Sequence, residues 1–201
     1  PHRWHTFTGQ FWENKSGIYK LLLKNADRLM SLFASKLAAD SFSQARFLTL
    51  EKITFGKEIT VLGHGSISGV DTKRFFPNPE VRTKIRTSLK VNDGQIVFLF
   101  VGRLAREKGV FDILAAFKKV LSGADQRAKP ELWLVGPDDE NVLPNLSALI
   151  LEETASIKIF GVTDRPEEYM TAADVICLPS YREGFGSIII EAGACGVPAI
   201  G

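Results

Sequence analysis

Cysteine and long apolar runs are both scarce in this sequence. Its 201 residues include only two cysteines, Cys177 and Cys195, each beside apolar residues. So few cysteines make a disulfide framework improbable and predict buried, unreactive thiols in a reducing, cytoplasmic compartment. The longest apolar run extends only from Ile96 to Val101, far short of the roughly 18 residues that cross a bilayer. The sequence therefore predicts no transmembrane segment, so that any membrane contact would be peripheral.

The chain also lacks a strong excess of charge, because its formal net charge is only +2. Residues 1–92 nevertheless carry 15 Lys and Arg against 7 Asp and Glu, whereas residues 93–201 carry 10 against 16. These charges of +8 and −6 predict two regions with different surfaces. A basic first part could meet nucleic acid, anionic lipid headgroups or phosphorylated substrates, and its scattered charges do not choose among them.

Length and composition predict a folded protein of more than one domain. Hydrophobic residues make up 45% and charged residues 24% of the chain, which is ordinary for globular proteins and argues against disorder. The chain begins at Pro1 rather than Met and ends in an unfinished strand at Val197–Gly201, so we expect an excerpt of a longer protein. A glycine-rich connection at Gly63–Gly69 places the domain boundary, giving domains of residues 1–70 and 71–201.

The hydrophobic pattern changes between these two domains. Residues 18, 21, 22, 30, 33 and 37 are apolar at near-helical spacing, which predicts helices over a core in the first domain. In the second domain, short apolar runs alternate with amphipathic stretches. The runs predict strands at 96–101, 131–136, 157–160 and 175–178, and the stretches predict helices at 111–121, 166–173 and 188–195. This alternation is typical of a doubly wound α/β domain with a parallel sheet, which binds ligands at the carboxyl ends of its strands.

The loop after the first of these strands contains two cations between glycines, in the segment Gly102–Gly109. Glycines permit close backbone approach, and Arg103 and Lys108 would suit a diphosphate. The segment is not the phosphate loop of nucleotide hydrolases, because no hydroxyl residue follows the lysine. The alternative is that both side chains are solvated loop cations.

The loop before the last predicted helix carries a second group of candidate residues, in the segment Tyr181–Glu191. A glycine-rich turn leads to Ser187 as the expected N-cap, and the amides of Gly186–Ile188 would face an anion. Glu191 and Glu183 could accept hydrogen bonds from ligand hydroxyls, as a sugar nucleotide requires. The alternative that Ser187 is only a cap and Glu191 only complements the helix dipole explains neither Glu183 nor the glycines. At another helix start, Asp164 and Glu167 have capping-box spacing.

Together these residues resemble the retaining family 4 glycosyltransferases (glycosyl transferases group 1) of the GT-B fold. The resemblance implies two Rossmann-like doubly wound domains, both incomplete in this chain. Its signature glutamates correspond to Glu183 and Glu191, and Ala173–Ser180 corresponds to the strand leading to them. The first part is similar to bacterial members that build lipid-linked or surface polysaccharides, through residues 5–10, 40–44 and 65–71.

The resemblance also implies roles for particular residues. Arg103, Lys108 and Glu183 are the expected catalytic residues. The expected donor-binding residues are Gly102, Gly161, Val162, Gly184, Phe185, Gly186, Ser187, Ile188 and Glu191. Many members have a histidine where this chain has Thr8, and His5 is a nearby substitute.

The implied reaction transfers a hexose-type sugar from a nucleotide diphosphate to an acceptor hydroxyl with retention of configuration. A front-face displacement would need no protein base, no cofactor and no metal. The family favours a UDP-sugar donor and a sugar or polyprenyl-diphosphate-linked acceptor. It also implies a cytoplasmic enzyme that contacts the inner face of the membrane and does not bind nucleic acid. Two alternatives stay open: another GT-B enzyme such as a sugar synthase, and a non-catalytic nucleotide-sugar binding module.

Other motifs do not support a different chemistry. The acidic run Asp138–Glu140 lacks the Asp-x-Asp spacing of a metal site, so we expect a solvated turn. No serine in Gly63–Gly69 has glycines two residues before and two after it, as a hydrolase nucleophile elbow would. The first strand of the second domain is not followed by a Gly-x-Gly-x-x-Gly turn, which disfavours a nicotinamide site.

Overall fold

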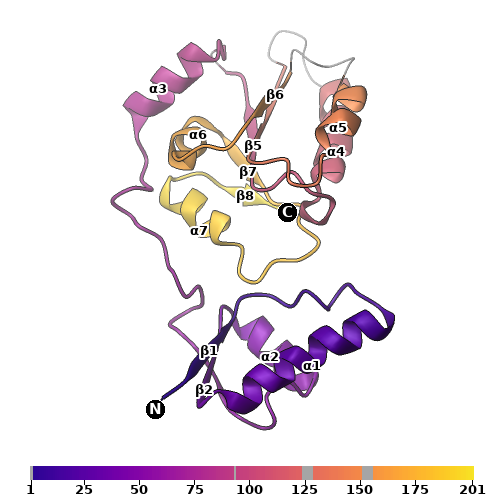
Figure 1. The fold of residues 1–201 in the computed structure, drawn as a ribbon. Helices are drawn as coiled ribbons and strands as arrows, with labels where there is room; N and C mark the ends of the chain where they lie inside the picture. Colours follow the sequence, from indigo (N-terminus) through magenta and orange to yellow (C-terminus); the bar gives the residue numbers. More distant parts are fainter. Residues whose placement is uncertain (1, 93, 124–128, 151–155) are drawn as a thin grey trace. The chain divides into compact units, whose positions relative to one another are not determined.

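The computed structural model describes residues 2–92, 94–123, 129–150 and 156–201. They form two compact units (Figure 1). Unit 1 contains the chain up to Gly69 together with Glu183–Ser187, and unit 2 contains Val70–Arg182 and Ile188–Gly201. In the part of the chain that the structure describes, no helix is both long enough and apolar enough to span a bilayer.

Unit 1 is built on a small parallel sheet with the strand order β1-β2-β3. Its elements are β1 (Trp4–Phe7), α1 (Gly17–Phe33), β2 (Lys36–Ala39), α2 (Phe42–Leu50) and β3 (Ile59–Val61). The core contains Phe7, Trp12, Leu37, Leu48 and Ile53, all less than 4% exposed. Unit 1 is therefore also built from parallel strands that are connected by helices.

Helix α1 does not place its apolar side over that core, contrary to the sequence-based expectation. Ile18, Leu22 and Phe33 are 77%, 62% and 60% exposed. The inward side carries Leu23 among polar groups: Trp12 donates its indole N–H to Asp27 at 2.6 Å, and Lys24 forms an ion pair with Glu51. Because these polar partners lie on neighbouring segments of unit 1, periodicity within α1 predicted the helix but the wrong buried face.

Unit 2 contains a five-stranded parallel sheet with the order β6-β5-β4-β7-β8. Its strands are β4 (Val97–Val101), β5 (Glu131–Val135), β6 (Ile157–Phe160), β7 (Val175–Cys177) and β8 (Ala199–Ile200). Its helices are α3 (Pro79–Ser88), η1 (Arg106–Lys108), α4 (Val110–Gly123), α5 (Leu143–Ile150), α6 (Pro166–Ala172) and α7 (Ser187–Ala194).

Helices cover both faces of this sheet (Figure 1). Alternate residues of a strand point to opposite faces, so Phe100, Leu132 and Leu134 pack with α4 and α5. Leu99 and Trp133 point the other way and pack with α6 and α7. The predicted doubly wound α/β fold with a parallel sheet is therefore confirmed.

The strand order creates a topological switch point between β4 and β7. From β4 the chain adds β5 and then β6 on one side, and it returns to pair β7 with the other side of β4. The loops that follow β4 and β7 thus leave neighbouring strand ends toward opposite faces. Open α/β sheets bind ligands in the crevice at such a point.

The capping box expected before α6 is absent. The N-cap of α6 is Arg165, which makes no capping hydrogen bond with its side chain. Instead, Glu167 and the carbonyl oxygen of Asp164 both accept hydrogen bonds from Arg74. A cation roughly 90 residues away in sequence therefore binds the two residues whose local spacing had predicted a capping box.

Candidate functional site

The loop after β4 holds Arg103 in an ion-pair network. Arg103 Nη2 lies 2.5 Å from Glu107 Oε1, and Arg103 Nη1 lies 3.9 Å from Asp139 Oδ2. The Arg103 side chain is 44% exposed, so its guanidinium remains open to solvent while its direction is set by the two carboxylates. Arg103 is therefore a surface cation with a defined orientation at the switch point.

The loop after β7 brings a second arginine to the same carboxylate. Arg182 Nη2 lies 3.7 Å from Glu107 Oε2, and the amide of Tyr181 donates to the Glu107 carbonyl oxygen at 3.0 Å. The Tyr181 hydroxyl also donates to Asp112 at 2.8 Å, which raises the Tyr181 pKa because the hydrogen bond and charge of Asp112 disfavour the phenolate. Sequence reasoning missed Glu107 and Arg182, although both lie within the two motifs it had identified.

The same two loops touch through their backbones near Lys108. Lys108 is half-buried in η1, and Gly109 follows it with φ of 70°. A Cβ atom on Gly109 would lie 2.1 Å from the carbonyl oxygen of Pro179. Only glycine fits a left-handed backbone in such close contact, so Gly109 permits the approach of the two loops that surround the switch point.

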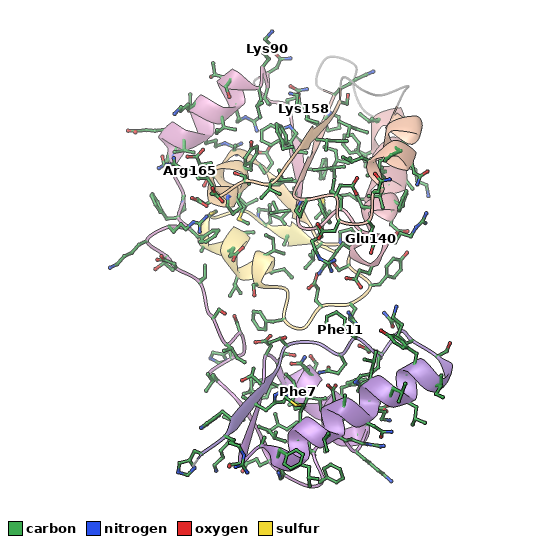
Figure 2. The ribbon with its side chains drawn as sticks, viewed as in Figure 1. Phe7, Phe11, Lys90, Glu140, Lys158 and Arg165 are labelled. Carbon is green, nitrogen blue, oxygen red and sulfur yellow. The ribbon has the colours of Figure 1, made fainter. Side chains whose placement is uncertain are left out.

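The acidic residues after β5 form a turn in which Asp139 and Glu140 are exposed, as expected, whereas Asp138 is half-buried and caps the next segment. Both Asp138 carboxylate oxygens accept backbone hydrogen bonds, from Val142 at 2.7 Å and Leu143 at 3.0 Å. Glu140 accepts from the Arg106 amide at 3.1 Å and lies near the end of the sheet opposite Lys158 (Figure 2). Among the residues that the structure describes, no group of His, Cys, Asp and Glu side chains could hold a metal.

The loop after β6 contains two of the expected donor-binding residues. Gly161 and Val162 are exposed, Val162 to 75%. The loop ends at Asp164, whose carbonyl oxygen accepts from Arg74. It therefore presents backbone and an apolar side chain to solvent at the carboxyl edge of the sheet.

Glu191 is half-buried in the middle of α7. Burial raises its pKa, an effect that the positive charge of Arg74 opposes and the negative charge of Glu167 reinforces. An ionised glutamate only accepts hydrogen bonds, whereas a protonated one also donates. Arg74 is thus the cation that favours the accepting form of Glu191.

The remaining candidates, Glu183–Ser187, group with unit 1. Ser41 Oγ donates to the Gly184 carbonyl oxygen at 3.1 Å, and a Cβ on Gly184 would lie 1.9 Å from the Thr8 carbonyl oxygen. Glu183 is exposed. Ser187 is the first residue of α7 and not the N-cap that we expected.

The predicted site residues are thus divided between the two units. Unit 2 holds Gly102, Arg103, Lys108, Gly161, Val162, Ile188 and Glu191, and unit 1 holds Glu183, Gly184, Phe185, Gly186 and Ser187.

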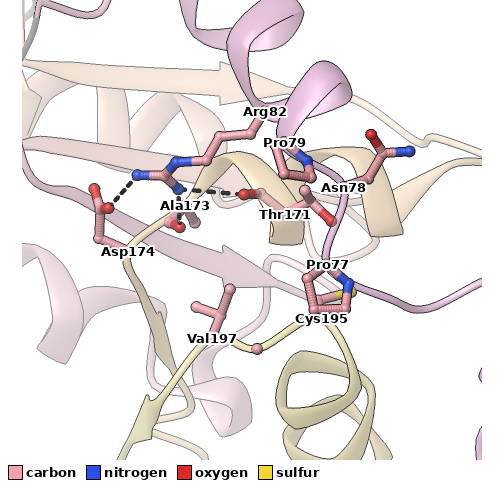
Figure 3. A pocket seen from close by; sticks show the side chains of 10 residues that line it. Pro77, Asn78, Pro79, Arg82, Thr171, Ala173, Asp174, Cys195 and Val197 are labelled. Atoms are coloured by element: carbon pink, nitrogen blue, oxygen red, sulfur yellow. Dashed lines mark hydrogen bonds and ion pairs between the residues drawn. The ribbon is translucent and has the colours of Figure 1, made fainter.

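Unit 2 also has a cavity of about 340 Å³ at the opposite, amino end of β7 and β8 (Figure 3). Arg82 Nη1 donates to the carbonyl oxygens of Thr171, Ala172 and Ala173, and Arg82 Nη2 pairs with Asp174 at 2.5 Å. These contacts satisfy the carboxyl end of α6, which is a structural task. The lining residues are Pro77, Asn78, Pro79, Arg82, Thr171, Ala173, Asp174, Cys195, Gly196 and Val197, and they include no candidate site residue.

Comparison with known protein families shows which family this chain belongs to. Residues 81–201, most of unit 2, match the model of the family described as glycosyl transferases group 1. The chain belongs to this family. The predicted membership of glycosyl transferases group 1 is confirmed, and the matched region contains Glu183, Glu191 and the Gly102–Gly109 loop.

Two of the curated relatives are named for the synthesis of capsular polysaccharide or teichuronic acid in bacteria. The capsular polysaccharide biosynthesis glycosyltransferase CapM of Staphylococcus aureus is 27% identical over 202 residues, which cover all of this chain and 52% of CapM. The putative teichuronic acid biosynthesis glycosyltransferase TuaC of Bacillus subtilis is 30% identical over 133 residues, covering 66% of this chain and 31% of TuaC. This chain thus spans about half or less of these relatives.

Solved structures support the same fold. The Anabaena protein HepE, determined in complex with UDP, matches with a TM-score of 0.77 and 20% identity over 98% of this chain and 52% of HepE. At that identity the similarity concerns the fold alone. The chain is therefore a partial GT-B structure.

Proposed function

We propose that this chain is the donor-binding part of a glycosyltransferase that moves a sugar from a nucleotide diphosphate to an acceptor hydroxyl. The observation that carries the proposal is the switch point of unit 2, where Arg103 and Arg182 flank Glu107 and Lys108 follows in η1. Cations at that position favour an anionic ligand such as a diphosphate. Family membership supports the same reading.

The proposed mechanism concentrates on the leaving diphosphate. Transfer with retention would proceed on one face of the sugar, with a phosphate oxygen receiving the acceptor proton, so that neither a protein base nor a metal takes part. Arg103 and Lys108 would stabilise the charge that develops on the phosphate, because prearranged cations act most strongly where charge appears in the transition state. Glu191 would accept from the ribose, and Gly161 and Val162 would border the base. Glu183 on the sugar hydroxyls, and backbone contacts from Gly102 and Gly184–Ile188, remain predictions from the family resemblance.

The names of CapM and TuaC support a role in bacterial surface polysaccharide or lipid-linked glycan synthesis. A UDP-sugar is the donor that we propose, in line with the UDP complex of HepE. A sugar or polyprenyl-diphosphate-linked acceptor, cytoplasmic location and contact with the inner membrane face belong to the same proposal. Nucleic acid is not an expected partner.

A thermal-shift panel on the intact protein tests this function. UDP-, GDP- and ADP-sugars should each be compared with their free nucleotides, and one donor class should raise the melting temperature selectively. Transfer to an acceptor sugar by the same protein would then separate an enzyme from a binding module. A selective shift without any transfer would favour the binding module, and no shift with any nucleotide would overturn the proposal.

A further inference from the structure

Arg74 joins two segments of unit 2 that lie far from it in sequence. Its Nε and Nη2 atoms donate to Glu167 Oε2 at 3.0 and 2.8 Å. Nη2 also donates to the carbonyl oxygen of Asp164. Glu167 is in the first turn of α6, and Asp164 ends the loop that follows β6. One guanidinium therefore ties this loop to the helix that follows it.

The backbone around Arg74 sets the direction of the guanidinium. The amides of Arg74 and Phe75 both donate to the Asp71 carbonyl oxygen, at 3.0 and 2.8 Å. Phe75 is only 7% exposed and packs in the core beside β4 and α6, while the guanidinium lies 5.2 Å from the centre of its ring. A planar fork of donors on an anchored backbone loses little freedom when it binds several acceptors.

Glu191 lies within the electrostatic reach of the same group. Burial raises the pKa of Glu191, Arg74 lowers it, and Glu167 raises it. Arg74 therefore balances two carboxylates, Glu167 by direct hydrogen bonds and Glu191 through space. Without that balance, the Glu167 charge would disfavour the ionised form of Glu191 that accepts hydroxyl donors.

We propose that Arg74 is a positioning residue for the nucleoside half of a nucleoside diphosphate. It would hold the loop after β6, where Gly161 and Val162 are expected to border the base, and keep Glu191 ready for the ribose. This inference rests on the proposed donor-binding function. It adds a residue from the segment before α3, outside the motifs that sequence reasoning had identified.

Isothermal titration of the intact protein tests the proposal with UDP, GDP, ADP and inorganic pyrophosphate as probes. For the nucleoside diphosphate that the wild type binds most tightly, Arg74→Gln should lower the affinity about tenfold. This is the effect of losing one charge-assisted contact. The pyrophosphate affinity of Arg74→Gln should stay unchanged, because Arg74 contacts Glu167 and Asp164, beside the loop proposed to border the base. The nucleotide affinity of Arg74→Lys should lie between those of the wild type and Arg74→Gln, since lysine keeps the charge but lacks the planar set of donors of the guanidinium. In turnover, the loss should appear mainly in the KM for the donor.

Arg165→Gln is the matched control. Arg165 also pairs with a glutamate of the first turn of α6, Glu168, at 2.8 Å, but the cation that lowers the pKa of Glu191 is Arg74. Its removal should leave the nucleotide affinity unchanged. If the melting temperature shows that Arg74→Gln does not fold, the nucleotide affinity of Arg74→Lys is compared with that of the wild type instead.

A second substitution separates charge balance from simple support of the fold. Adding Glu167→Gln to Arg74→Gln removes the uncompensated carboxylate and should restore part of the nucleotide affinity. No recovery would overturn the positioning role, as would equal affinity of the wild type and Arg74→Gln. A wild type that binds none of the nucleotides would instead overturn the proposed function itself.

Discussion

Arg103 tests the catalytic proposal at the scale of one residue. Arg103→Ala in the intact enzyme should lower turnover about a hundredfold, the effect of losing one contact to developing charge. Its stability should change by less than about 1 kcal/mol, because the ion pairs that it loses are solvent-exposed. Steady-state kinetics and denaturant unfolding of the same preparation measure both quantities.

Arg106→Ala is the control for Arg103 because it removes the same charge from the same loop. The Arg106 guanidinium lies 4.6 Å from the ring centre of Phe111, whereas Glu107 pairs with Arg103 and Arg182. Its turnover should stay within about twofold of the wild type. Equal turnover of Arg103→Ala and Arg106→Ala would remove Arg103 from the mechanism.

The two cysteines allow a second test at this scale. Burial raises the pKa of Cys177 to about 11. Burial also raises the pKa of Cys195, although a hydrogen bond with Thr171 opposes it. Since the thiolate is the reactive form, neither cysteine should react with iodoacetamide in the native protein at pH 8, whereas both should react in urea. Mass spectrometry counts the adducts, and rapid native labelling of either residue would contradict its burial.

Gly109 tests the contact between two elements, the loops after β4 and β7. Gly109→Ala adds a methyl group 2.1 Å from the Pro179 carbonyl oxygen at a φ of 70°, so the loops must separate. The free energy of unfolding should fall by more than about 2 kcal/mol, from the strained backbone and the clash together. Gly123→Ala, at a helical position with open space, should be neutral or stabilising by up to about 1 kcal/mol. Similar losses in both variants, measured by urea unfolding, would contradict the close approach.

Asp174 links three elements of unit 2. Its carboxylate pairs with Arg82 at 2.5 Å and Arg86 at 3.1 Å on α3, and accepts from the Val97 amide at 2.8 Å. Asp174→Asn should cost about 2 kcal/mol, less than a fully buried pair because the carboxylate is 28% exposed. Glu168→Gln, which breaks an exposed pair on α6, should cost less than about 0.5 kcal/mol.

The pH dependence of the Asp174 effect follows from its pKa. Burial raises that pKa, but the Val97 amide and the two arginines outweigh burial and lower it below its ordinary value of 3.8. A carboxylate with a lowered folded pKa stabilises above its unfolded pKa, and this stabilisation is lost as the pH falls through the folded value. The difference between wild type and Asp174→Asn should therefore be constant near neutral pH and shrink below pH 3.8. A difference that grows in acid would contradict this assignment.

The elements of unit 2 were predictable because their signal is local. Each predicted strand is found to within one or two residues, since a strand covered on both faces is apolar at every position. The α6 cap and the buried face of α1 were predicted wrongly because their partners, Arg74 for Glu167 and Glu51 for Lys24, lie elsewhere in the chain. The shared use of Glu107 by Arg103 and Arg182 depends on strand order in the same way.

At the scale of the whole molecule, the structure changes the meaning of the charge asymmetry. Six of the 15 Lys and Arg in residues 1–92 follow Val70 and so belong to unit 2. Arg74, Arg82 and Arg86 are ion-paired there with Glu167 and Asp174. Counted by unit, the net charges are +3 and −1 rather than +8 and −6. Half of the excess that favoured a basic first domain therefore belongs to unit 2, where three of its arginines are ion-paired, which weakens the electrostatic case for a membrane surface.

Hydrogen exchange of the intact protein with and without UDP tests the assignment of the donor to unit 2. A ligand that binds the native state slows opening of the segments that it holds. Peptides covering residues 102–109, 161–167 and 179–182 should therefore exchange more slowly with UDP, whereas those covering β2 and β3 should not change. Inorganic pyrophosphate should protect only 102–109 and 179–182, because Gly161 and Val162, in the third peptide, are proposed to border the base. UDP that binds by titration yet protects only the strands of unit 1 would place the donor elsewhere.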